Sequence, residues 1–229
     1  MSSTLLTDRD GGVAILILHR PEALHSLSNE LVRALVGTLE DCDADDGIGA
    51  IILTGHGKRA FTAGVDRREV DNGRLGPGPD DDPVSAIVSC RKPIVAAVNG
   101  LCVSAGLEII LACDAVYAAR TARFADRFVH AGRLPTWGLS QRLARQVGPQ
   151  RAKELSLSGR FIDADQAREI GLVNQVFDPA DLLLETLTLA HAIAANDARA
   201  VQIRKEVIDA GYQLALGDAV ERERRSAAG

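Results

Sequence analysis

The chain has 229 residues, of which 46% are hydrophobic and 25% charged, a composition typical of a folded globular protein and not of a disordered one. A formal net charge of −5 and only 3% aromatic residues argue against a nucleic-acid partner, which needs basic surfaces and stacking rings. The longest apolar runs, such as 13–18, are far below the ~20 residues that cross a bilayer, so we expect no membrane span.

The N-terminal segment and the cysteines indicate the compartment. A secretory signal has a basic stretch followed by an apolar one, and MSSTLLTDRDGG does not show this pattern. The four cysteines lack the paired close spacing of zinc or redox sites: Cys42, Cys90, Cys102 and Cys113. We interpret them as reduced, mostly buried thiols, and we expect a cytoplasmic protein without a metal site.

Strand and helix patterns alternate along the chain. Short apolar, β-branched runs predict strands at 13–19, 49–54, 94–99 and 114–118. Turn signals followed by helical periodicity predict helices at 28–43, 148–157, 163–170 and 178–196. Nearly continuous apolar strands separated by helices indicate an α/β fold whose strands are covered on both faces.

Capping residues support three of these helices. Ser28 can cap the first of them, and Asp163 with Gln166 resembles a capping box. Asp178 before Pro179 predicts the start of the 178–196 helix, because proline suits the first helical turn.

Composition changes suggest how the chain is divided. Gly, Pro and adjacent Asp residues predict a mobile surface loop over 71–83. The charged tail GDAVERERRSAAG, 217–229, is expected to fray. We therefore expect an α/β core over 1–180 and a C-terminal helical segment over 181–229.

Two glycine-containing turns follow predicted strands and lead into helical patterns: AFTAGVD at 60–66 and NGLCVSAGLE at 99–108. Small residues let the backbone pass close to a ligand, and a turn that opens a helix points unpaired N–H groups outward. Two such turns facing one another would form an oxyanion hole. Either turn alone is weak evidence, since most turns of this kind are only structural.

These two turns, within AFTAGVD and KPIVAAVNGLCVSAGLEIILACD, resemble the signature of the crotonase superfamily, also called the enoyl-CoA hydratase/isomerase family. The similarity continues in HRPEALHSLS, GRLPTWGLSQRLARQVG and LSGRFIDADQAREIGLVNQVF, from about His19 to Asp181. The resemblance implies a superhelix of repeated β-β-α units, then helices that pack into a homotrimer or a dimer of trimers. It also implies acyl-CoA thioesters as substrates, with no further cofactor. The C-terminal segment looks shortened relative to the family.

The resemblance also implies the catalytic groups. The two backbone N–H groups that stabilise the thioester enolate map to Ala63 and Ala105, and the first catalytic carboxylate falls on Glu108. Alanine can replace glycine at Ala105 provided that the turn needs no positive φ there. Glu108, one turn further along the helix, could hold water or shuttle the α-proton of the acyl group. The alternative is that Glu108 merely favours the helix dipole.

The second carboxylate of the hydratases is absent here. It is a Glu in the segment that aligns with FADRFVH, 124–130, and the aligned position is Phe128. If this stretch is extended, Asp126, Phe128 and His130 project to one side, so Asp126 or His130 could supply the missing acid or base. Otherwise Phe128, which we count among the substrate-contacting residues, marks altered chemistry or a weakened hydratase, and the other two are ordinary surface residues.

Further substrate contacts are expected at five positions. Ala23 and His25 lie where the family holds the CoA adenine and pantetheine through backbone groups. Asp66 is a ligand or a structural, helix-capping Asp, and Arg67 meets CoA phosphates or belongs to a solvated helix face. Trp137 lines the acyl pocket or packs against the core.

Three functions from different classes remain open. The first is hydration of a 2-enoyl-CoA, with double-bond isomerisation on a single carboxylate as a close alternative, although the family's isomerases usually carry that carboxylate at the other site. The second is a non-catalytic acyl-CoA-binding protein, which Phe128 favours. The third is a serine hydrolase built on Ser104, since CVSAG approaches the G-x-S-x-G pattern, but it needs a nearby histidine such as His25, His56 or His130.

Overall fold

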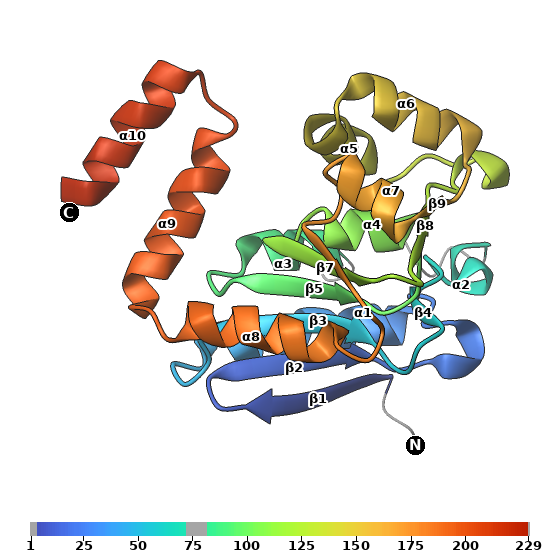
Figure 1. The fold of residues 1–229 in the computed structure, drawn as a ribbon, viewed down its shortest axis with the longest axis horizontal. Helices are drawn as coiled ribbons and strands as arrows, with labels where there is room; N and C mark the ends of the chain where they lie inside the picture. Colours follow the sequence, from blue (N-terminus) through green and yellow to red (C-terminus); the bar gives the residue numbers. More distant parts are fainter. Residues whose placement is uncertain (1–3, 72–81, 229) are drawn as a thin grey trace.

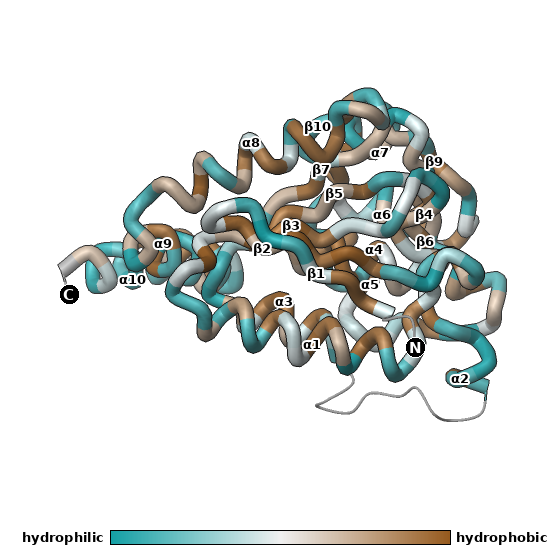
Figure 2. Tube along the Cα trace, turned by 90° about the horizontal axis from the view of Figure 1, so that it is seen from below, coloured by the Kyte–Doolittle hydropathy of each residue, from teal (hydrophilic) through white to brown (hydrophobic). Residues whose placement is uncertain are grey.

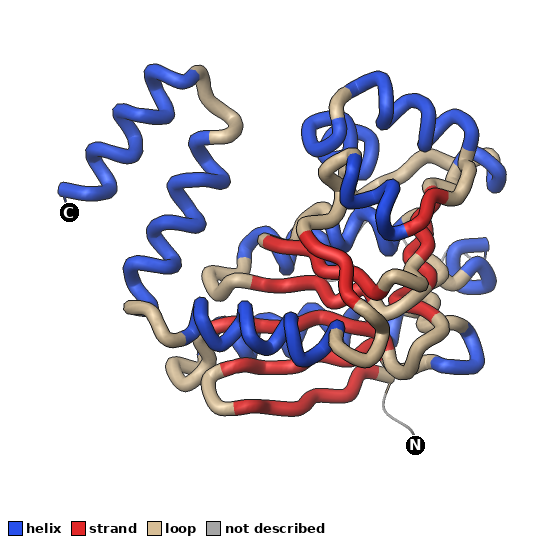
Figure 3. Tube along the Cα trace, in the orientation of Figure 1, coloured by secondary structure: helices blue, strands red, loops and turns tan. Residues whose placement is uncertain are grey.

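The computed structural model describes residues 4–71 and 82–228, and its strands form two sheets (Figures 1 and 3). The larger sheet has the order β1 (Leu5–Asp10), β2 (Val13–Leu18), β3 (Ala50–Gly55), β5 (Ile94–Val98), β7 (Ala115–Ala119) and β10 (Gln175–Phe177). The smaller sheet has the order β4 (Ala60–Thr62), β6 (Leu101–Val103), β8 (Arg123–Ala125) and β9 (Ile162–Asp163).

Successive strands alternate between the two sheets. The chain leaves the larger sheet along β3, β5 and β7, and each time the next strand, β4, β6 or β8, enters the smaller sheet. The neighbouring strands of this series are parallel in both sheets, as a superhelical path that returns to the same sheet in the same direction requires. Helices follow the β-β pairs: α2 (Arg67–Asp71) and α3 (Pro83–Ser89) after β4, and α4 (Ala105–Ile110) after β6. This confirms the expected superhelix of β-β-α units.

The strands predicted from apolar runs are confirmed. The ranges 13–19, 49–54, 94–99 and 114–118 correspond to β2, β3, β5 and β7, with ends that differ by no more than one residue. The sequence patterns missed β1, β10 and the short strands of the smaller sheet. β10 and the strands of the smaller sheet have only two or three residues each, too few for a periodic signal.

Helices cover both faces of the larger sheet (Figure 2). Alternate residues of β2 show this: Leu16 and Leu18 belong to the core that includes α1 (Asn29–Ala44), whereas Val13 and Ile15 pack with α8 (Leu182–Ala194). Both faces of these central strands are therefore apolar, which explains the nearly continuous hydrophobic runs in the sequence.

Two of the three capping predictions are confirmed. Ser28 Oγ accepts from Leu31 N at the start of α1, and Asp163 and Gln166 form a capping box at α7 (Ala164–Glu169). The expected helix start at Asp178 is wrong. Residues 178–181 form a turn in which the Asp178 carbonyl accepts from Asp181 N, and α8 begins at Leu182.

The C-terminal tail is helical and not frayed as expected. α9 (Ala198–Gly211) and α10 (Leu216–Ala228) form a helical hairpin that projects from the sheets (Figure 1). Charged side chains that suggested a solvated tail instead pair within and between these helices, as Arg222 with Glu206 at 2.8 Å and Arg225 with Glu221 at 3.3 Å. The 181–229 segment starts with α8, which packs on the larger sheet. The division of the chain into a core over 1–180 and a C-terminal segment over 181–229 stays a prediction.

Two further α-helices pack against each other, and the first of them also contacts α4. They are α5 (Leu139–Val147) and α6 (Pro149–Ser158), the second of which matches the helix predicted at 148–157. Most of the loop predicted at 71–83 lies outside the described residues. No described helix is long and apolar enough to cross a membrane.

Candidate active site

Glu108 lies on α4, one turn beyond the residue that opens this helix. Ser104, which precedes α4, has φ = 50°, whereas Ala105 is the first helical residue. The condition for alanine at the proposed donor is therefore met, because the left-handed conformation falls on Ser104. Ala105 N–H donates to no acceptor among the described residues and stays available at the helix start.

Backbone N–H groups hold the Glu108 carboxylate in place. Glu108 is 1% exposed, and its Oε1 accepts from Trp137 N at 2.7 Å and Leu139 N at 3.3 Å. Leu139 is the first residue of α5, so this oxygen lies at a helix N-terminus. Burial nevertheless outweighs these hydrogen bonds and raises the pKa of Glu108 to about 7. Such a carboxyl group can take up and release a proton near neutral pH.

The two glycine-containing turns lie against each other. A methyl group added to Gly64 would lie 3.1 Å from the Val103 carbonyl oxygen and 3.8 Å from Ala105 N. A methyl group added to Gly106 would lie 2.8 Å from Thr62 Cγ2. Both turns are thus brought together by glycines at points of close backbone approach.

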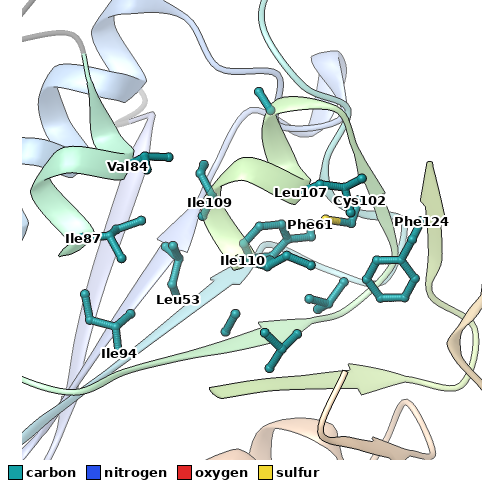
Figure 4. Close-up of a cluster of buried hydrophobic side chains, with 14 of the residues drawn as sticks. Leu53, Phe61, Val84, Ile87, Ile94, Cys102, Leu107, Ile109, Ile110 and Phe124 are labelled. Carbon is teal, nitrogen blue, oxygen red and sulfur yellow. The ribbon is translucent and has the colours of Figure 1, made fainter. Parts of the chain in front are cut away.

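A shared hydrophobic core supports both turns (Figure 4). Phe61 from the first turn, Cys102 and Leu107 from the second, and Ile109 and Ile110 from the following part of α4 are all buried in one cluster. Tight packing of this kind leaves little freedom for either turn to move independently.

The backbone N–H groups of the first turn differ in availability. Ala63 N–H, the donor expected from the resemblance, donates to the Leu24 carbonyl at 3.0 Å. Val65 N–H has no acceptor among the described residues, since the bridge to Leu27 uses the Gly64 carbonyl and Asp66 N–H instead. The geometry therefore favours Val65 over Ala63 as the donor of the first turn.

The segment around Phe128 does not continue as a strand. β8 ends at Ala125, Asp126 Oδ1 accepts from Phe128 N at 3.1 Å, and Val129–Ala131 forms a short 3-10 helix. The condition under which Asp126, Phe128 and His130 would project to one side, an extended stretch, is therefore not met. Asp126 is buried, Phe128 packs against the core, and the exposed His130 ring lies against the end of α6, 3.3 Å from the Ser158 carbonyl.

Asp126 nevertheless lies beside the site. Strand register pairs Val103 with Ala125, Ser104 N donates to the Ala125 carbonyl, and Arg127 N donates to Ser104 Oγ. The carboxylate of Asp126 also contributes to the raised pKa of Glu108. The structure thus brings this auxiliary candidate toward Glu108, while the contacts of His130 lie at α6.

The candidate CoA-contacting turn is built from tight local hydrogen bonds. Ala23 ends a 3-10 turn, Pro21–Ala23, and its carbonyl accepts from Ser26 N. His25 is 2% exposed, and both its ring nitrogens have partners within the protein. These hydrogen bonds within the protein leave the expected role of Ala23 and His25 in CoA binding a prediction.

Three other candidates have different surroundings. Asp66 accepts from Arg20 Nη2 at 2.9 Å and from Arg68 N at 3.1 Å, as a structural, helix-capping residue does. Arg67 is exposed at the start of α2. Trp137 is buried in the core, and its Nε1–H has no hydrogen-bond acceptor within the described part of the chain.

The contacts of Ser104 give no support to a serine hydrolase. Its hydroxyl oxygen accepts from Arg127 N at 3.0 Å, and no described histidine is hydrogen-bonded to it. Within residues 4–71 and 82–228, no group of three or more His, Cys, Asp or Glu side chains is arranged to hold a metal ion.

The two-sheet superhelix, with a buried glutamate in the first turn of α4, is that of a crotonase-fold protein. The family described as enoyl-CoA hydratase/isomerase matches residues 8–227. The chain belongs to this family.

Relatives over nearly the whole chain agree with this assignment. A probable peroxisomal enoyl-CoA hydratase 1 of Arabidopsis thaliana is 37% identical, covering 95% of this chain and 82% of the relative. The 2,3-dehydroadipyl-CoA hydratase of Escherichia coli is also 37% identical, covering 97% and 88%. The crystal structure of an enoyl-CoA hydratase from Bacillus anthracis matches with a TM-score of 0.89 at 32% identity, covering 98% and 90%.

Sequence reasoning missed several groups of the site. Val65 directly follows Gly64, but which N–H of this turn is free depends on contacts with Leu24 and Leu27, far away in the chain. The N–H groups of Trp137 and Leu139 carry no side-chain signal at all. Gly138 before α5, with φ = 99°, is the one local sign that a helix start lies there.

Proposed function

We propose that the protein is an enoyl-CoA hydratase that adds water to a 2-enoyl-CoA with Glu108 as its proton-transferring group. The observation that carries this proposal is the buried Glu108 carboxylate, one turn from the free Ala105 N–H and beside the turn that holds the free Val65 N–H. Enoyl-CoA hydratases among the relatives support the substrate class. No further cofactor is required by this chemistry.

In this mechanism, the N–H groups of Val65 and Ala105 donate to the thioester oxygen. The Glu108 carboxylate takes a proton from water as the water oxygen bonds to C3, and the C2–C3 π electrons move to form the enolate. The protonated Glu108 then returns the proton to C2, which yields a 3-hydroxyacyl-CoA. The two backbone donors stabilise the negative charge of the enolate oxygen.

The second candidate is isomerisation of the double bond. It needs only removal of one proton and its return to another carbon, so a single carboxylate suffices. Phe128 favours this candidate, because its side chain cannot transfer a proton. A monofunctional enoyl-CoA isomerase of Mycobacterium smegmatis is 32% identical, covering 93% of this chain and 96% of that one, with a TM-score of 0.81.

A homotrimer or dimer of trimers is the proposed assembly. The α9–α10 hairpin supports it, because this hairpin carries exposed apolar side chains such as Leu216, which is 81% exposed. Light scattering coupled to size-exclusion chromatography tests this assembly, and a monomer would contradict it. The cytoplasmic location stays a prediction.

The test of function is a mass-spectrometric assay of 2-enoyl- and 3-enoyl-CoA thioesters in D₂O with the wild type and Glu108→Gln. Addition of water that is lost in the variant supports the hydratase. Movement of the double bond or deuterium exchange without added water supports the isomerase. If neither reaction occurs while the thioester still binds, the protein is an acyl-CoA-binding protein and the proposed enzyme is wrong.

A further inference from the structure

The His25 ring makes two hydrogen bonds that define its protonation state. Arg20 N lies 3.0 Å from Nδ1, and the His56 carbonyl oxygen lies 3.0 Å from Nε2. A backbone N–H can only donate, so Nδ1 must be the unprotonated acceptor, and a carbonyl can only accept, so Nε2 must carry the hydrogen. The contacts therefore require a neutral imidazole with its hydrogen on Nε2.

The backbone around this ring adopts a conformation that needs support. Leu24 and His25 have φ values of 49° and 56°, and they are two of only three described non-glycine residues with positive φ. Such residues persist where surrounding contacts determine them, and they gather at functional sites. The bond from Arg20 N to the His25 ring, together with that from His25 N to the Arg20 carbonyl, supplies such contacts.

The same turn holds the first half of the candidate oxyanion hole. The Leu24 carbonyl accepts from Ala63 N at 3.0 Å, and the His25 carbonyl accepts from Thr62 Oγ1 at 2.7 Å. Thr62 Oγ1 in turn accepts from Gly64 N at 3.2 Å. A displacement of the turn would therefore act directly on the backbone that leads to Val65.

We propose that His25 is a positioning residue, whose neutral imidazole holds the 20–27 turn and through it aligns the Val65 N–H with the thioester oxygen. This inference rests on the proposed function, since it concerns the same oxyanion hole. It assigns to the His25 side chain a role distinct from the backbone contacts with CoA expected at this residue.

Protonation of His25 would undo the arrangement. A hydrogen on Nδ1 would face the hydrogen of Arg20 N, which destroys that bond and places a charge in a buried site. Four charged or titratable groups surround the ring: Glu22, His56, His19 and Arg20. The Arg20 guanidinium is paired with Asp66. Burial, the largest effect, and the charges of the two histidines lower the pKa of His25, while the hydrogen bond to the His56 carbonyl and the charge of Glu22 oppose them. The neutral form is thus maintained near neutral pH and lost in acid.

The test uses Glu108→Gln as the background, so that the titration of Glu108 does not mask that of His25. Affinity for a saturated acyl-CoA, butyryl-CoA, is measured by calorimetry between pH 5 and 8. In this background we expect constant affinity near neutral pH and a loss approaching tenfold per pH unit below the pKa of His25. Adding His25→Asn should flatten the profile, because the Asn carbonyl oxygen can accept from Arg20 N without titrating and Asn tolerates a positive φ.

His56→Gln is the matched control. It removes a neighbouring titratable ring but keeps the carbonyl that accepts from His25, so the acid loss of affinity should remain. An acid loss that persists in His25→Asn, or one that disappears in His56→Gln, would overturn the proposal.

A second measurement works without a ligand. Hydrogen exchange of the Ala63 amide, followed by NMR, should show lower protection as His25 becomes protonated, and the ¹⁵N shifts of the ring should show hydrogen on Nε2 at neutral pH. Unchanged protection would contradict the positioning role. If no variant binds butyryl-CoA at pH 8 while this titration is observed, the proposed function fails and the role of His25 in holding the turn stands.

Discussion

Glu108 Oε1 accepts a hydrogen bond from Trp137 N at 2.7 Å, although the two residues are 29 positions apart. The bond joins the end of one β-β-α unit to the loop that leads into α5, and it fixes the orientation of a buried carboxylate whose other oxygen stays available to a reactant. A single glutamate, held in this way, is the group on which the proposed chemistry depends.

The first prediction concerns the loss of this carboxylate. Gln in place of Glu108 keeps an oxygen for Trp137 N and Leu139 N but cannot transfer a proton, so the geometry is retained while the chemistry is not. We expect kcat for the reaction found with the wild type to fall about 10²–10⁴-fold, with KM changed only a few-fold. A variant with wild-type kcat would show that another group moves the proton.

The second prediction is the pH dependence of stability. Since the pKa of Glu108 is raised from 4.5 to about 7, the folded protein holds a proton there that the unfolded chain has lost. The stabilisation by the protonated form is complete below pH 4.5 and disappears as the pH rises through about 7. Glu108→Gln should therefore gain on the order of 3 kcal/mol relative to the wild type between pH 4.5 and pH 8.

Urea unfolding of both proteins at the two pH values measures this difference. Titrating groups that do not interact with Glu108 contribute equally to the two proteins and cancel. An equal pH dependence in wild type and variant would mean that Glu108 has an ordinary pKa in the folded protein.

The parts of this site that sequence could predict are those that depend on neighbours in the chain. Ser28 caps α1 and Gly64 opens a turn because of their own conformational preferences, and both are recognisable locally. The choice between Ala63 and Val65 as the free donor depends instead on which of them meets the Leu24 carbonyl, a contact across 39 positions that no local pattern contains.

The secondary structure of the segment after β8 could not be predicted from its sequence either. The sequence of FADRFVH leaves open that the stretch is extended, but the Asp126 side chain accepts from Phe128 N and a 3-10 helix follows at Val129–Ala131. Asp often forms such local bonds in competition with a strand, so the pattern alone does not decide between the two.

The third prediction tests the close approach of the two turns. Gly106→Ala places a methyl group 2.8 Å from Thr62 Cγ2 and 3.1 Å from Cys102 Sγ, so Thr62 or the backbone of one turn must shift. We expect a loss of about 1–3 kcal/mol in unfolding free energy and a decrease in kcat/KM. Gly37→Ala is the control: it lies within α1 with no neighbour within 4 Å of the added methyl, and it should stabilise the protein by up to about 1 kcal/mol at unchanged activity. Full activity in Gly106→Ala would contradict a tightly built oxyanion hole.

The fourth prediction distinguishes the two possible donors of the first turn. Replacing the amide of Val65 by an ester, through semisynthesis, removes its N–H and keeps the side chain. If Val65 is the donor, kcat/KM should fall about 10²–10³-fold. The same change at Ala63 removes the bond to the Leu24 carbonyl, so it should lower stability and affect the rate much less. The reverse ranking of rates would return the role to Ala63.

The fifth prediction concerns Asp126, which raises the pKa of Glu108 through its negative charge. Asn at this position keeps the oxygen that accepts from Phe128 N but removes the charge, so the pKa of Glu108 should fall and the acid limb of kcat/KM should move to lower pH. This shift is expected whether or not Asp126 takes part in the reaction.

The value of kcat at the new optimum then decides the role of Asp126. A change of only a few-fold means that the residue acts on the charge of Glu108 alone, as one-carboxylate chemistry requires. A fall of about 10²–10⁴-fold means that Asp126 transfers a proton and takes the part of the second carboxylate that the resemblance implies at position 128. His130→Gln should leave the acid limb in place, because its ring lies against Ser158 at the end of α6 and does not contribute to the pKa of Glu108. An acid limb that stays fixed in Asp126→Asn would contradict the electrostatic coupling of the two carboxylates, and with it any shared role in proton transfer.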